Sequence, residues 1–301
     1  MQGTPNASLG QHRRQPRPRP LRTTIVPITT ISTATSTTTA PATSIPVGQL
    51  TRLTANFGTN PTNVGISVYK PSSVKPNPGL LVALHGCGGN AQQFFSGSQF
   101  RQLADQRGFL VIYGSAANDM NCWDVTTSPS LTHDGGGDSR GLASAVRYAV
   151  SEWGVNPEKV FVTGFSSGAM MTNVMAGTYP DLFKGGAAFA GVAMGCLSKG
   201  NAPFSRTPQQ WGDIVKKAYP AYTGSYPKMQ LWHGTADNVL NITNLNEEVK
   251  QWTNMHGISQ TATSTSPGTP KSNWAKSVYG AGAGRELCRD WEWARFARGR
   301  D

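Results

Sequence analysis

The stretch from Lys159 to Tyr179 constrains this chain more than any other part of the sequence. Val160 to Thr163 is a short β-branched and aromatic run, which is typical of a buried strand. A segment with apolar residues at helical spacing begins at Ala169 and continues through Met170, Val174 and Met175. Only Gly164-Phe165-Ser166-Ser167-Gly168 lies between them, so the chain must pass from a strand into a helix through a very sharp turn.

Gly-x-Ser-x-Gly between a strand and a helix is the pattern of a nucleophile elbow. Such a turn leaves no room for side chains at Gly164 and Gly168, and it holds the Ser166 hydroxyl exposed at the start of the helix. The backbone N–H of Ser167 can then donate to an oxyanion. The alternative is a Gly/Ser-rich turn without chemistry. The strand and the helix on either side favour Ser166 as a nucleophile.

Strands and helices alternate through the rest of the predicted folded domain, residues 49–280. The residues from Leu50 to Phe57 and from Gly65 to Tyr69 are expected to form an antiparallel hairpin. The alternation predicts a mostly parallel sheet with helices on both faces, and with the elbow it indicates an α/β-hydrolase fold. The further strands are expected at 80–84, 108–113, 186–192 and 228–232, and the helices around Phe100 to Ala104, at 140–153, and at 244–255 with Gly257 as the cap.

The part of the chain before Gln49 differs in composition from the domain. Residues 1–22 hold five Arg and no acidic residue, which predicts a disordered Arg/Pro-rich arm. Ser and Thr make up more than half of the chain from Thr23 to Ser44, so residues 23–48 are expected to be an extended, O-glycosylated linker. No hydrophobic signal region follows Met1, and no apolar run is long enough to span a membrane.

The net charge of +11 raises the question of a nucleic-acid partner. Much of the excess sits in the Arg/Pro-rich arm, and no nucleic-acid-binding motif occurs in the domain. We therefore expect neither nucleic acid nor membrane as a partner. A nucleic-acid-binding protein led by the arm is the alternative, and it would show salt-sensitive DNA retention that disappears when residues 1–22 are deleted.

A serine hydrolase of this fold also needs a second oxyanion donor, an acid and a histidine, in the chain order Ser, acid, His. His85-Gly86-Cys87-Gly88-Gly89 follows an early strand, and we expect the Cys87 N–H to be the second donor, with Gly86 or Gly88 as alternatives. Asp237 follows the strand at 228–232 and is expected to be the acid; a turn-capping Asp is the alternative. No cluster has metal-ligand spacing, so neither a metal nor another cofactor is expected.

From Asn56 to about Tyr279 the chain resembles the fungal acetylxylan esterases and feruloyl esterases, within the polyhydroxybutyrate-depolymerase-like group of α/β-hydrolases. The residues that carry the resemblance are Asn56-Phe57-Gly58, Asn60-Pro61-Thr62-Asn63-Val64-Gly65, Leu103-Ala104-Asp105-Gln106, Cys122-Trp123-Asp124, Gly136-Gly137-Asp138-Ser139, Ser166-Ser167-Gly168-Ala169-Met170-Met171-Thr172-Asn173-Val174 and His233-Gly234-Thr235-Ala236-Asp237.

The resemblance implies a secreted, monomeric esterase that removes acetyl groups, or alternatively hydroxycinnamoyl groups, from acylated plant xylan. A signal peptide, and a binding module at the far end of the linker, would then precede this chain. The resemblance further implies a Cys87–Cys122 disulfide. Asn241-Ile242-Thr243 is a candidate glycan acceptor, and Trp123 and Asp138 are expected either to line the substrate cleft or to belong to the scaffold. A non-catalytic polysaccharide-binding pseudo-enzyme is the alternative from another class.

The chain departs from the family at the catalytic histidine. The family carries it in a Gly-x-Gly-His-x-x-Pro pattern near the C-terminus, and this pattern is missing here. The chain has five histidines: His12, His85, His133, His233 and His256. Only His256 follows Asp237, and we expect it to pack at the end of its helix, which leaves it a weak fallback. Without a base, Ser166 stays a weak nucleophile, so the chain is expected to be inactive as written.

The tail of the chain, 281–301, suggests how the histidine was lost. Read one nucleotide later, the codons for Asp290 to Ala297 allow Thr-Gly-Ser-Gly-His-x-Ser-Pro, with both glycines forced. We therefore expect that a frame error or a misplaced splice junction has replaced the C-terminus. The sheet is then expected to be truncated at its C-terminal edge. Sequencing of the transcript across codon 280 is expected to show the shift, and an unbroken frame that matches this chain would contradict it.

Overall fold

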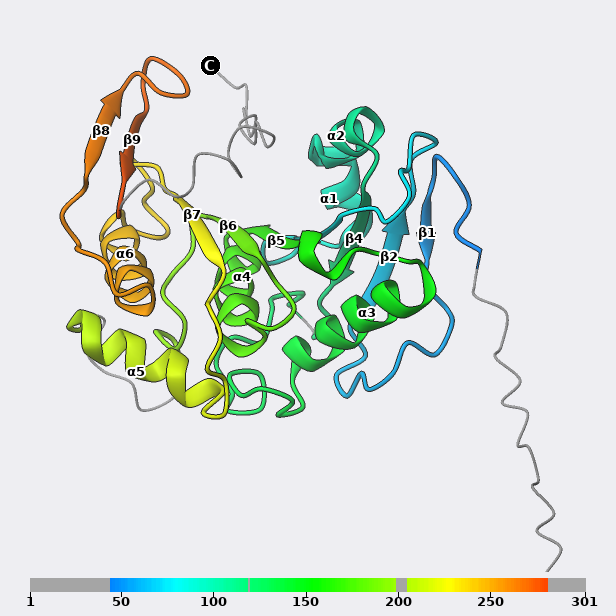
Figure 1. Ribbon diagram of the computed structural model, residues 1–301, viewed down its shortest axis with the longest axis horizontal. Helices are drawn as coiled ribbons and strands as arrows, with labels where there is room; N and C mark the ends of the chain where they lie inside the picture. The colour runs from blue at the N-terminus through cyan, green and yellow to red at the C-terminus, as the bar shows by residue number, and fades with distance from the viewer. Residues whose placement is uncertain (1–43, 119, 199–204, 281–301) are drawn as a thin grey trace, which may run out of the picture. The chain divides into compact units, whose positions relative to one another are not determined.

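A seven-stranded sheet organises the residues that the computed structural model describes, which are 44–118, 120–198 and 205–280 (Figure 1). The strand order is β1-β2-β4-β3-β5-β6-β7. β1 and β2 are antiparallel, whereas β3 to β7 are all parallel, which confirms the predicted fold class. The arm, the tail and residues 23–43 of the linker lie outside the described residues.

The strands of the sheet are β1 (Leu50–Arg52), β2 (Gly65–Tyr69), β3 (Leu80–Leu84), β4 (Leu110–Ser115), β5 (Val160–Phe165), β6 (Gly185–Phe189) and β7 (Lys228–Trp232). The helices are α1 (Ala91–Gly97), α2 (Phe100–Arg107), α3 (Asp138–Glu152), the 3-10 turn η1 (Pro157–Lys159), α4 (Ser167–Thr178), α5 (Pro208–Ala218) and α6 (Thr243–Met255). A separate hairpin consists of β8 (Ser264–Pro267) and β9 (Ala275–Val278).

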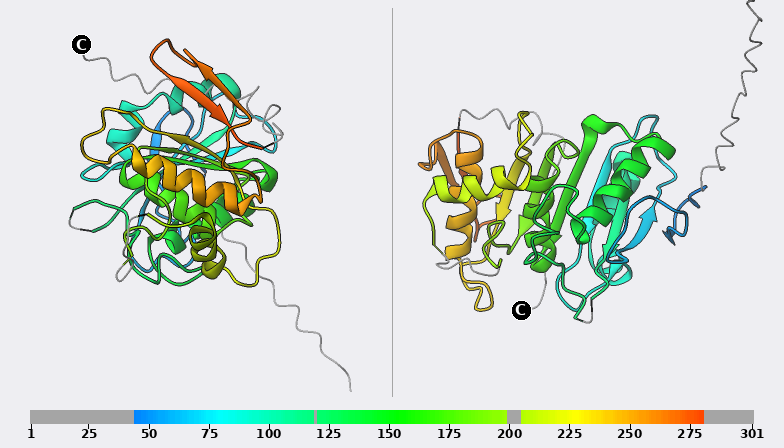
Figure 2. Two further views of the ribbon diagram at one scale, coloured as in Figure 1. Left: turned by 90° about the vertical axis from the view of Figure 1, so that its left-hand side faces the viewer. Right: turned by 90° about the horizontal axis from the view of Figure 1, so that it is seen from below.

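Helices cover both faces of the central strands. Every residue of β3 is buried, as expected for a parallel strand between two layers. Leu80, Val82 and Leu84 pack in a cluster with residues of α3 and α4, whereas Leu81 and Ala83 pack in another with residues of α1 and α2. α5 and α6 lie together at the β7 end of the sheet (Figure 2). Alternate side chains of β3 therefore pack into two separate hydrophobic clusters, one on each face of the sheet.

Several strand boundaries differ from the sequence prediction. β1 ends at Arg52 rather than at Phe57. At two further boundaries the backbone leaves the extended conformation. Gly108, expected to begin a strand, instead caps α2 in the left-handed conformation (φ 75°), so β4 begins at Leu110. β6 ends at Phe189 because Ala190 has a positive φ of 54°. The sequence analysis also assigned no element to α5, although Thr207 and Gln210 form a capping box at its start.

β7 is one of the two edge strands of the sheet in the described part of the chain, where it pairs with β6 alone. Four of its five residues are half-buried and Lys228 is exposed, in contrast to the fully buried β3. This edge is where the expected truncation would fall.

A buried polar network attaches α6 to α4 and to the loop after β6. The Asn173 amide donates to Glu248 Oε1 (2.5 Å) and to the Val192 carbonyl (3.0 Å), and the Trp252 indole N–H donates to Asn173 Oδ1 (2.9 Å). Glu248 is fully buried, and Oε2 has no partner among the described residues. Burial raises the pKa of Glu248 to about 8, so this side chain is a neutral acid at neutral pH.

Glu247, the preceding residue, has the opposite electrostatics. Burial by itself would raise the pKa of Glu247. Hydrogen bonds from Lys250 Nζ (2.7 Å), the Trp211 indole (2.7 Å) and other donors outweigh that effect and leave the pKa lowered. Two adjacent carboxyl groups on one helix are therefore in opposite protonation states at neutral pH.

We expect Glu248→Gln to change the pH dependence of stability. The Glu248 carboxyl of the unfolded chain ionises above pH ~4.3, while the folded one stays protonated up to about pH 8. The wild-type chain should therefore lose about 1.4 kcal/mol of unfolding free energy per pH unit through this group between those values, and the variant should not. Urea unfolding at several pH values from 5 to 8 measures the difference.

Glu247→Gln is the matched control. Because the pKa of Glu247 is lowered on folding, its contribution is fully present above the unfolded pKa and should stay constant over the same pH range. Identical pH profiles for the wild type and Glu248→Gln would contradict the neutral state of Glu248.

Candidate active site

Ser166 lies in the strained turn between β5 and α4. Its φ of 55° and ψ of −119° are unusual for a residue with a side chain, at a cost of about 1–3 kcal/mol. The Ser166 N–H donates to the Phe189 carbonyl (2.9 Å), which ties the turn to β6. A Cβ at Gly164 would lie 2.2 Å from the Gly168 carbonyl oxygen, and one at Gly168 would lie 2.1 Å from the Leu84 carbonyl oxygen. The glycines are therefore required, as the elbow pattern predicts.

The glycine loop after β3 lies directly against this turn. A Cβ at Gly86 would lie 3.4 Å from Ser166 Cβ. The Gly88 N–H donates to the Met120 carbonyl (3.1 Å), so this amide is already occupied. The Ser167 amide is at the first position of α4, where backbone N–H groups have no partner within the helix. These contacts favour Cys87 or Gly86 over Gly88 as the second oxyanion donor.

The His85 side chain is part of the loop's support. Its Nε2 accepts from the Ala116 N–H (3.1 Å), so Nδ1 carries the proton and donates to the Gly86 carbonyl (2.7 Å). The ring is buried, and burial lowers the pKa of His85. Both ring nitrogens are engaged, so His85 is not a base for Ser166.

Residues 116–118 and 120–124, which follow β4, form the segment that holds the glycine loop and the elbow together. The predicted Cys87–Cys122 disulfide is confirmed, and it joins this segment to the loop. The Trp123 indole N–H donates to the His85 carbonyl (2.9 Å), while the Trp123 backbone N–H donates to Ser167 Oγ (2.8 Å). One residue thus contacts both suppliers of oxyanion donors. This role of Ser167 Oγ was not predicted from the sequence, because the elbow pattern carries no signal for it.

Trp123 and Asp138 do not line a cleft. Trp123 is 3 % exposed and packs in the core with α3 and α4. Asp138 is 4 % exposed, accepts from the Asp124 N–H (2.9 Å), and its own N–H donates to Ser130 Oγ (3.0 Å). Burial raises the pKa of Asp138. The expectation that these two residues line the cleft is therefore corrected, and both belong to the scaffold.

Asp237 lies in the loop after β7. Like Ser166, it lies beyond the carboxyl ends of the parallel strands. Asp237 Oδ1 accepts from the N–H groups of Val239 and Leu240 (2.9 Å each). The Leu240 hydrogen bond is the main cause that lowers the pKa of Asp237, so the carboxylate is ionised at neutral pH. His233 Nε2 donates to the Leu240 carbonyl (2.6 Å) and lies 3.6 Å from Asp237 Oδ2, which is too long for a hydrogen bond.

His256 lies at the amino end of the parallel strands, whereas Ser166 lies at their carboxyl end. It follows the last residue of α6, and its Nε2 donates to the carbonyl of Pro227 (3.1 Å), the residue just before β7. β7 and β5 run parallel, and five residues of strand span about 16 Å. The residue is half-buried, and burial lowers the pKa of His256. The fallback role for His256 is therefore wrong.

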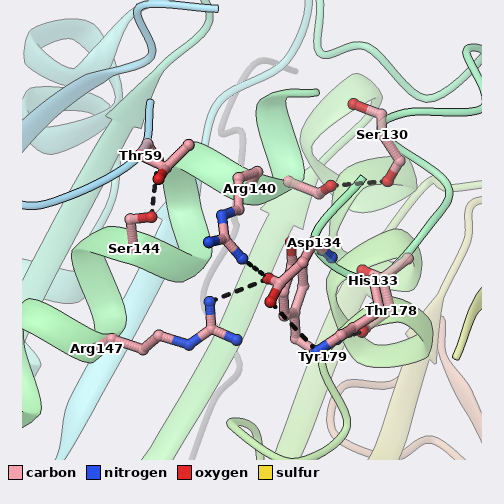
Figure 3. A network of polar contacts seen from close by, with 10 residues as sticks. Thr59, Ser130, His133, Asp134, Arg140, Ser144, Arg147, Thr178 and Tyr179 are labelled. Atoms are coloured by element: carbon pink, nitrogen blue, oxygen red, sulfur yellow. Dashed lines mark hydrogen bonds and ion pairs between the residues drawn. The ribbon is translucent and has the colours of Figure 1, made fainter. Parts of the chain in front are cut away.

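His133 belongs to a polar network around Asp134, at the far end of α4 (Figure 3). Its Nδ1 donates to the carbonyl of Thr178 (2.6 Å), the last residue of α4, and its ring stacks on Tyr219 at 3.6 Å. Arg140 and Arg147 both pair with Asp134 in the same network. Twelve helical residues separate this network from Ser166 by about 18 Å. His12, the fifth histidine, lies outside the described residues.

Residues 44–118, 120–198 and 205–280 contain neither a candidate metal centre nor a candidate membrane-spanning helix. No group of three or more His, Cys, Asp or Glu side chains there is arranged to hold a metal ion. In the same residues, no helix combines the length and the apolar character needed to cross a membrane.

We expect Gly168→Ala to destabilise the fold, because the new methyl group would lie 2.1 Å from a backbone oxygen of β3 rather than from a flexible side chain. Overpacking of this kind costs about 1–3 kcal/mol. Gly97→Ala in α1 is the control, since nothing lies within 4 Å of its Cβ position. Urea unfolding of both variants tests this, and equal stability of Gly168→Ala and wild type would refute the close backbone packing.

Comparisons with known proteins agree with this geometry. The family model described as Esterase PHB depolymerase matches residues 66–273. The chain is 60% identical over 254 residues to an acetylxylan esterase of Coprinopsis cinerea (80% of this chain, 68% of that protein) and 46% identical over 242 residues to feruloyl esterase B of Talaromyces stipitatus (76% and 67%).

A solved structure extends the likeness to three dimensions. The acetyl xylan esterase from Aspergillus awamori superposes with a TM-score of 0.75 at 39% sequence identity, covering 77% of this chain and 89% of that one. The family match spans the elbow, the glycine loop and the Asp237 loop. The chain therefore belongs to the PHB depolymerase family of esterases.

Proposed function

We propose that this chain is a serine carboxylic-ester hydrolase that deacetylates xylan. The observation that carries the proposal is the position of Ser166, which is held at a strained turn against a glycine loop, beside the Ser167 amide at the start of α4. The substrate is proposed from the relatives, because the chain is 60% identical over 254 residues to an acetylxylan esterase. A metal or another cofactor has no role in the proposed reaction.

The mechanism is two-step acyl transfer. Ser166 Oγ attacks the acetyl carbonyl carbon, and the N–H groups of Ser167 and Cys87 stabilise the oxyanion. The alkoxide of the sugar leaves, and water then releases acetate from the acyl-enzyme. Asp237 is the acid that orients the base.

Of the four described histidines, His85 uses both ring nitrogens, and His133 and His256 lie at the far ends of α4 and β7. His233 donates through Nε2 to the Leu240 carbonyl, and its Nδ1 is buried without a hydrogen-bond partner. We therefore propose that the proton transfers have no base among the described residues.

We further propose that the protein is secreted. The Cys87–Cys122 disulfide supports this, because such bonds form and persist in oxidising compartments. Asn241, the candidate glycan acceptor, is exposed just before α6. Monomeric action on a cell-wall polysaccharide remains part of the same proposal.

We expect this chain to hydrolyse 4-nitrophenyl acetate some four to six orders of magnitude more slowly than an intact triad enzyme, because loss of a triad member typically costs that much. A fluorophosphonate should nevertheless label Ser166 slowly, and Ser166→Ala should remove the label. Mass spectrometry of the labelled peptide checks both. His256→Gln should label like the wild type.

One result would contradict the absence of a base, and another would contradict the esterase function. Ordinary turnover by this chain would show that a base acts on Ser166 after all. Complete failure of Ser166 to react, together with xylan binding, would favour the non-catalytic polysaccharide-binding alternative.

A feruloyl esterase is the second candidate, and a specific feature favours it. Phe189 and Trp232 stack at 5.6 Å at the ends of β6 and β7, and Trp274 packs edge-on against Trp232 at 5.3 Å. Phe165 occupies the same rung of the sheet, immediately before Ser166. Aromatic side chains beside the nucleophile suit an aromatic acyl group.

The two substrates can be separated by comparing acetylated xylan with methyl ferulate. The comparison uses a chain in which the shifted-frame sequence replaces residues 281–301, so that a histidine is present. Faster release of acetate than of ferulate supports the deacetylase, and the reverse supports the alternative.

A further inference from the structure

We propose that a cavity at the amino end of the sheet binds a uronate, which is a sugar unit with a carboxylate, of an acidic cell-wall polysaccharide. The inference rests on the proposed function and deepens it, because it gives the esterase a second contact with the same class of substrate, away from Ser166. The size and position of the cavity, its two unpaired lysines and the glutamate beside them carry the inference.

The cavity lies at the end of the parallel strands that is remote from Ser166. Its volume is about 380 Å³, within the usual range for ligand pockets. Residues 44–45, residues of the segment 70–78 between β2 and β3, the start of β4 and the end of α3 line it. Asn77 and Gly154 in the lining are exposed, so a ligand can enter from solvent. The length of a strand, about 16–20 Å, separates the cavity from the nucleophile.

Two lysines of the lining have no anionic partner. Within the part of the chain that the structure describes, lysine side chains form ion pairs at Lys184 and Lys250, but not at Lys70 or Lys75. The stem of Lys75 is packed against Gly108, where a Cβ would lie 2.9 Å from Lys75 Cγ. Lys70 is half-buried at the end of β2. The cavity therefore presents two ammonium groups that an anion can pair with.

The end of α3 contributes an acid and an aromatic ring. Glu152 accepts a hydrogen bond from Ser151 Oγ (3.2 Å), and its carboxylate is the acidic group of the described lining. Trp153 is half-buried, and Tyr148 packs edge-on against its ring at 5.4 Å. The indole N–H of Trp153 has no acceptor among the described residues. An aromatic ring in a cavity wall suits the apolar C–H face of a sugar.

This mixture of charges favours a sugar acid over a simpler anion. The carboxylate of a uronate can accept from Lys70 and Lys75, while its hydroxyl groups can donate to Glu152. A phosphate dianion brings more negative charge against the same glutamate and fewer donors for it. A neutral sugar leaves both ammonium groups unpaired. The volume equals that of about a dozen water molecules, which suits one sugar unit.

The proposed contact is non-covalent and leaves the chemistry at Ser166 unchanged. The cavity and the elbow lie at opposite ends of the strands, so a uronate in the cavity does not occupy the nucleophile. A protein with two such contacts stays on its polysaccharide longer than the elbow alone would allow, because the second contact forms at a high effective concentration.

The test measures binding of three oligosaccharides of similar length to the full chain. The first is a xylo-oligosaccharide with a glucuronate side unit, the second is the same chain without it, and the third is an oligogalacturonate. NMR titration follows the Trp153 indole signal, which is assigned through its loss in Trp153→Phe. We expect at least one acidic probe to bind about tenfold tighter than the unsubstituted chain, the usual worth of a hydrogen bond to a charged group. The tighter of the two acidic probes names the source of the uronate.

Substitution of the two lysines tests their role. The double variant Lys70→Gln, Lys75→Gln should lose the tenfold preference. Lys271→Gln, Lys276→Gln is the matched control, because it removes the same charge from exposed residues outside the lining and should keep the preference. The preference of the wild type should also shrink as salt is raised from 0.05 M to 0.5 M, since salt screens pairs of charges.

The outcomes separate this inference from the proposed function. Equal binding of all three oligosaccharides overturns the inference, and so does a preference that survives in the double variant Lys70→Gln, Lys75→Gln. Displacement of the acidic probe by inorganic phosphate at similar concentration also overturns it, in favour of a general anion site. Each of these results leaves the esterase proposal standing when a fluorophosphonate labels Ser166. A uronate preference without any labelling of Ser166 contradicts the esterase proposal alone.

Discussion

Backbone-on-backbone packing at Gly168 and Gly164 is the contact on which the site depends. The start of α4 sits so close to the end of β3 that no Cβ fits between Gly168 and the Leu84 carbonyl. This closeness places the glycine loop, which leaves β3 at the next residue, against the side chain of Ser166. Nucleophile and oxyanion donors are thus brought together by the absence of side chains rather than by polar bonds between them.

The bonds that hold the site instead come from residues 116–118 and 120–124. The disulfide, the Met120 carbonyl and the Trp123 indole all hold the glycine loop, and the Trp123 amide holds Ser167. Electrostatic stabilisation of an oxyanion needs donors that are fixed before the reaction, since reorganisation would cost what they contribute. This segment supplies that rigidity in advance.

The acid of the site is independent of this unit. Asp237 is oriented by the amides of its own loop, and His233 ties that loop closed through the Leu240 carbonyl. β6 pairs with both β5 and β7 and so joins the two halves of the site. A proton acceptor between them would connect Ser166 with Asp237, and of the described histidines His85 is engaged through both ring nitrogens, whereas His133 and His256 lie at the far ends of α4 and β7.

The sequence alone predicted the fold class, the elbow and the main strands, because these depend on local patterns. Apolar runs specify strands, and only Gly164 and Gly168 allow the turn at Ser166. Local patterns failed where backbone conformation changes without a marker: Ala190, an ordinary residue, ends β6 with a positive φ. α5 was missed as well, although its helix start at Thr207 carries a capping box that could have been recognised.

Tertiary structure decided what each candidate side chain does. Trp123 and Asp138 could equally face a cleft or the interior by sequence, and packing against α3, α4 and Ser130 put them inside. The order of histidines along the chain left His256 as the fallback base for Ser166. The parallel sheet, however, places His256 at the amino end of the strands, opposite the end that carries Ser166. Residue types and spacing determine which chemistry is available, whereas strand direction and burial determine which groups can meet, because both depend on contacts between segments far apart in the chain.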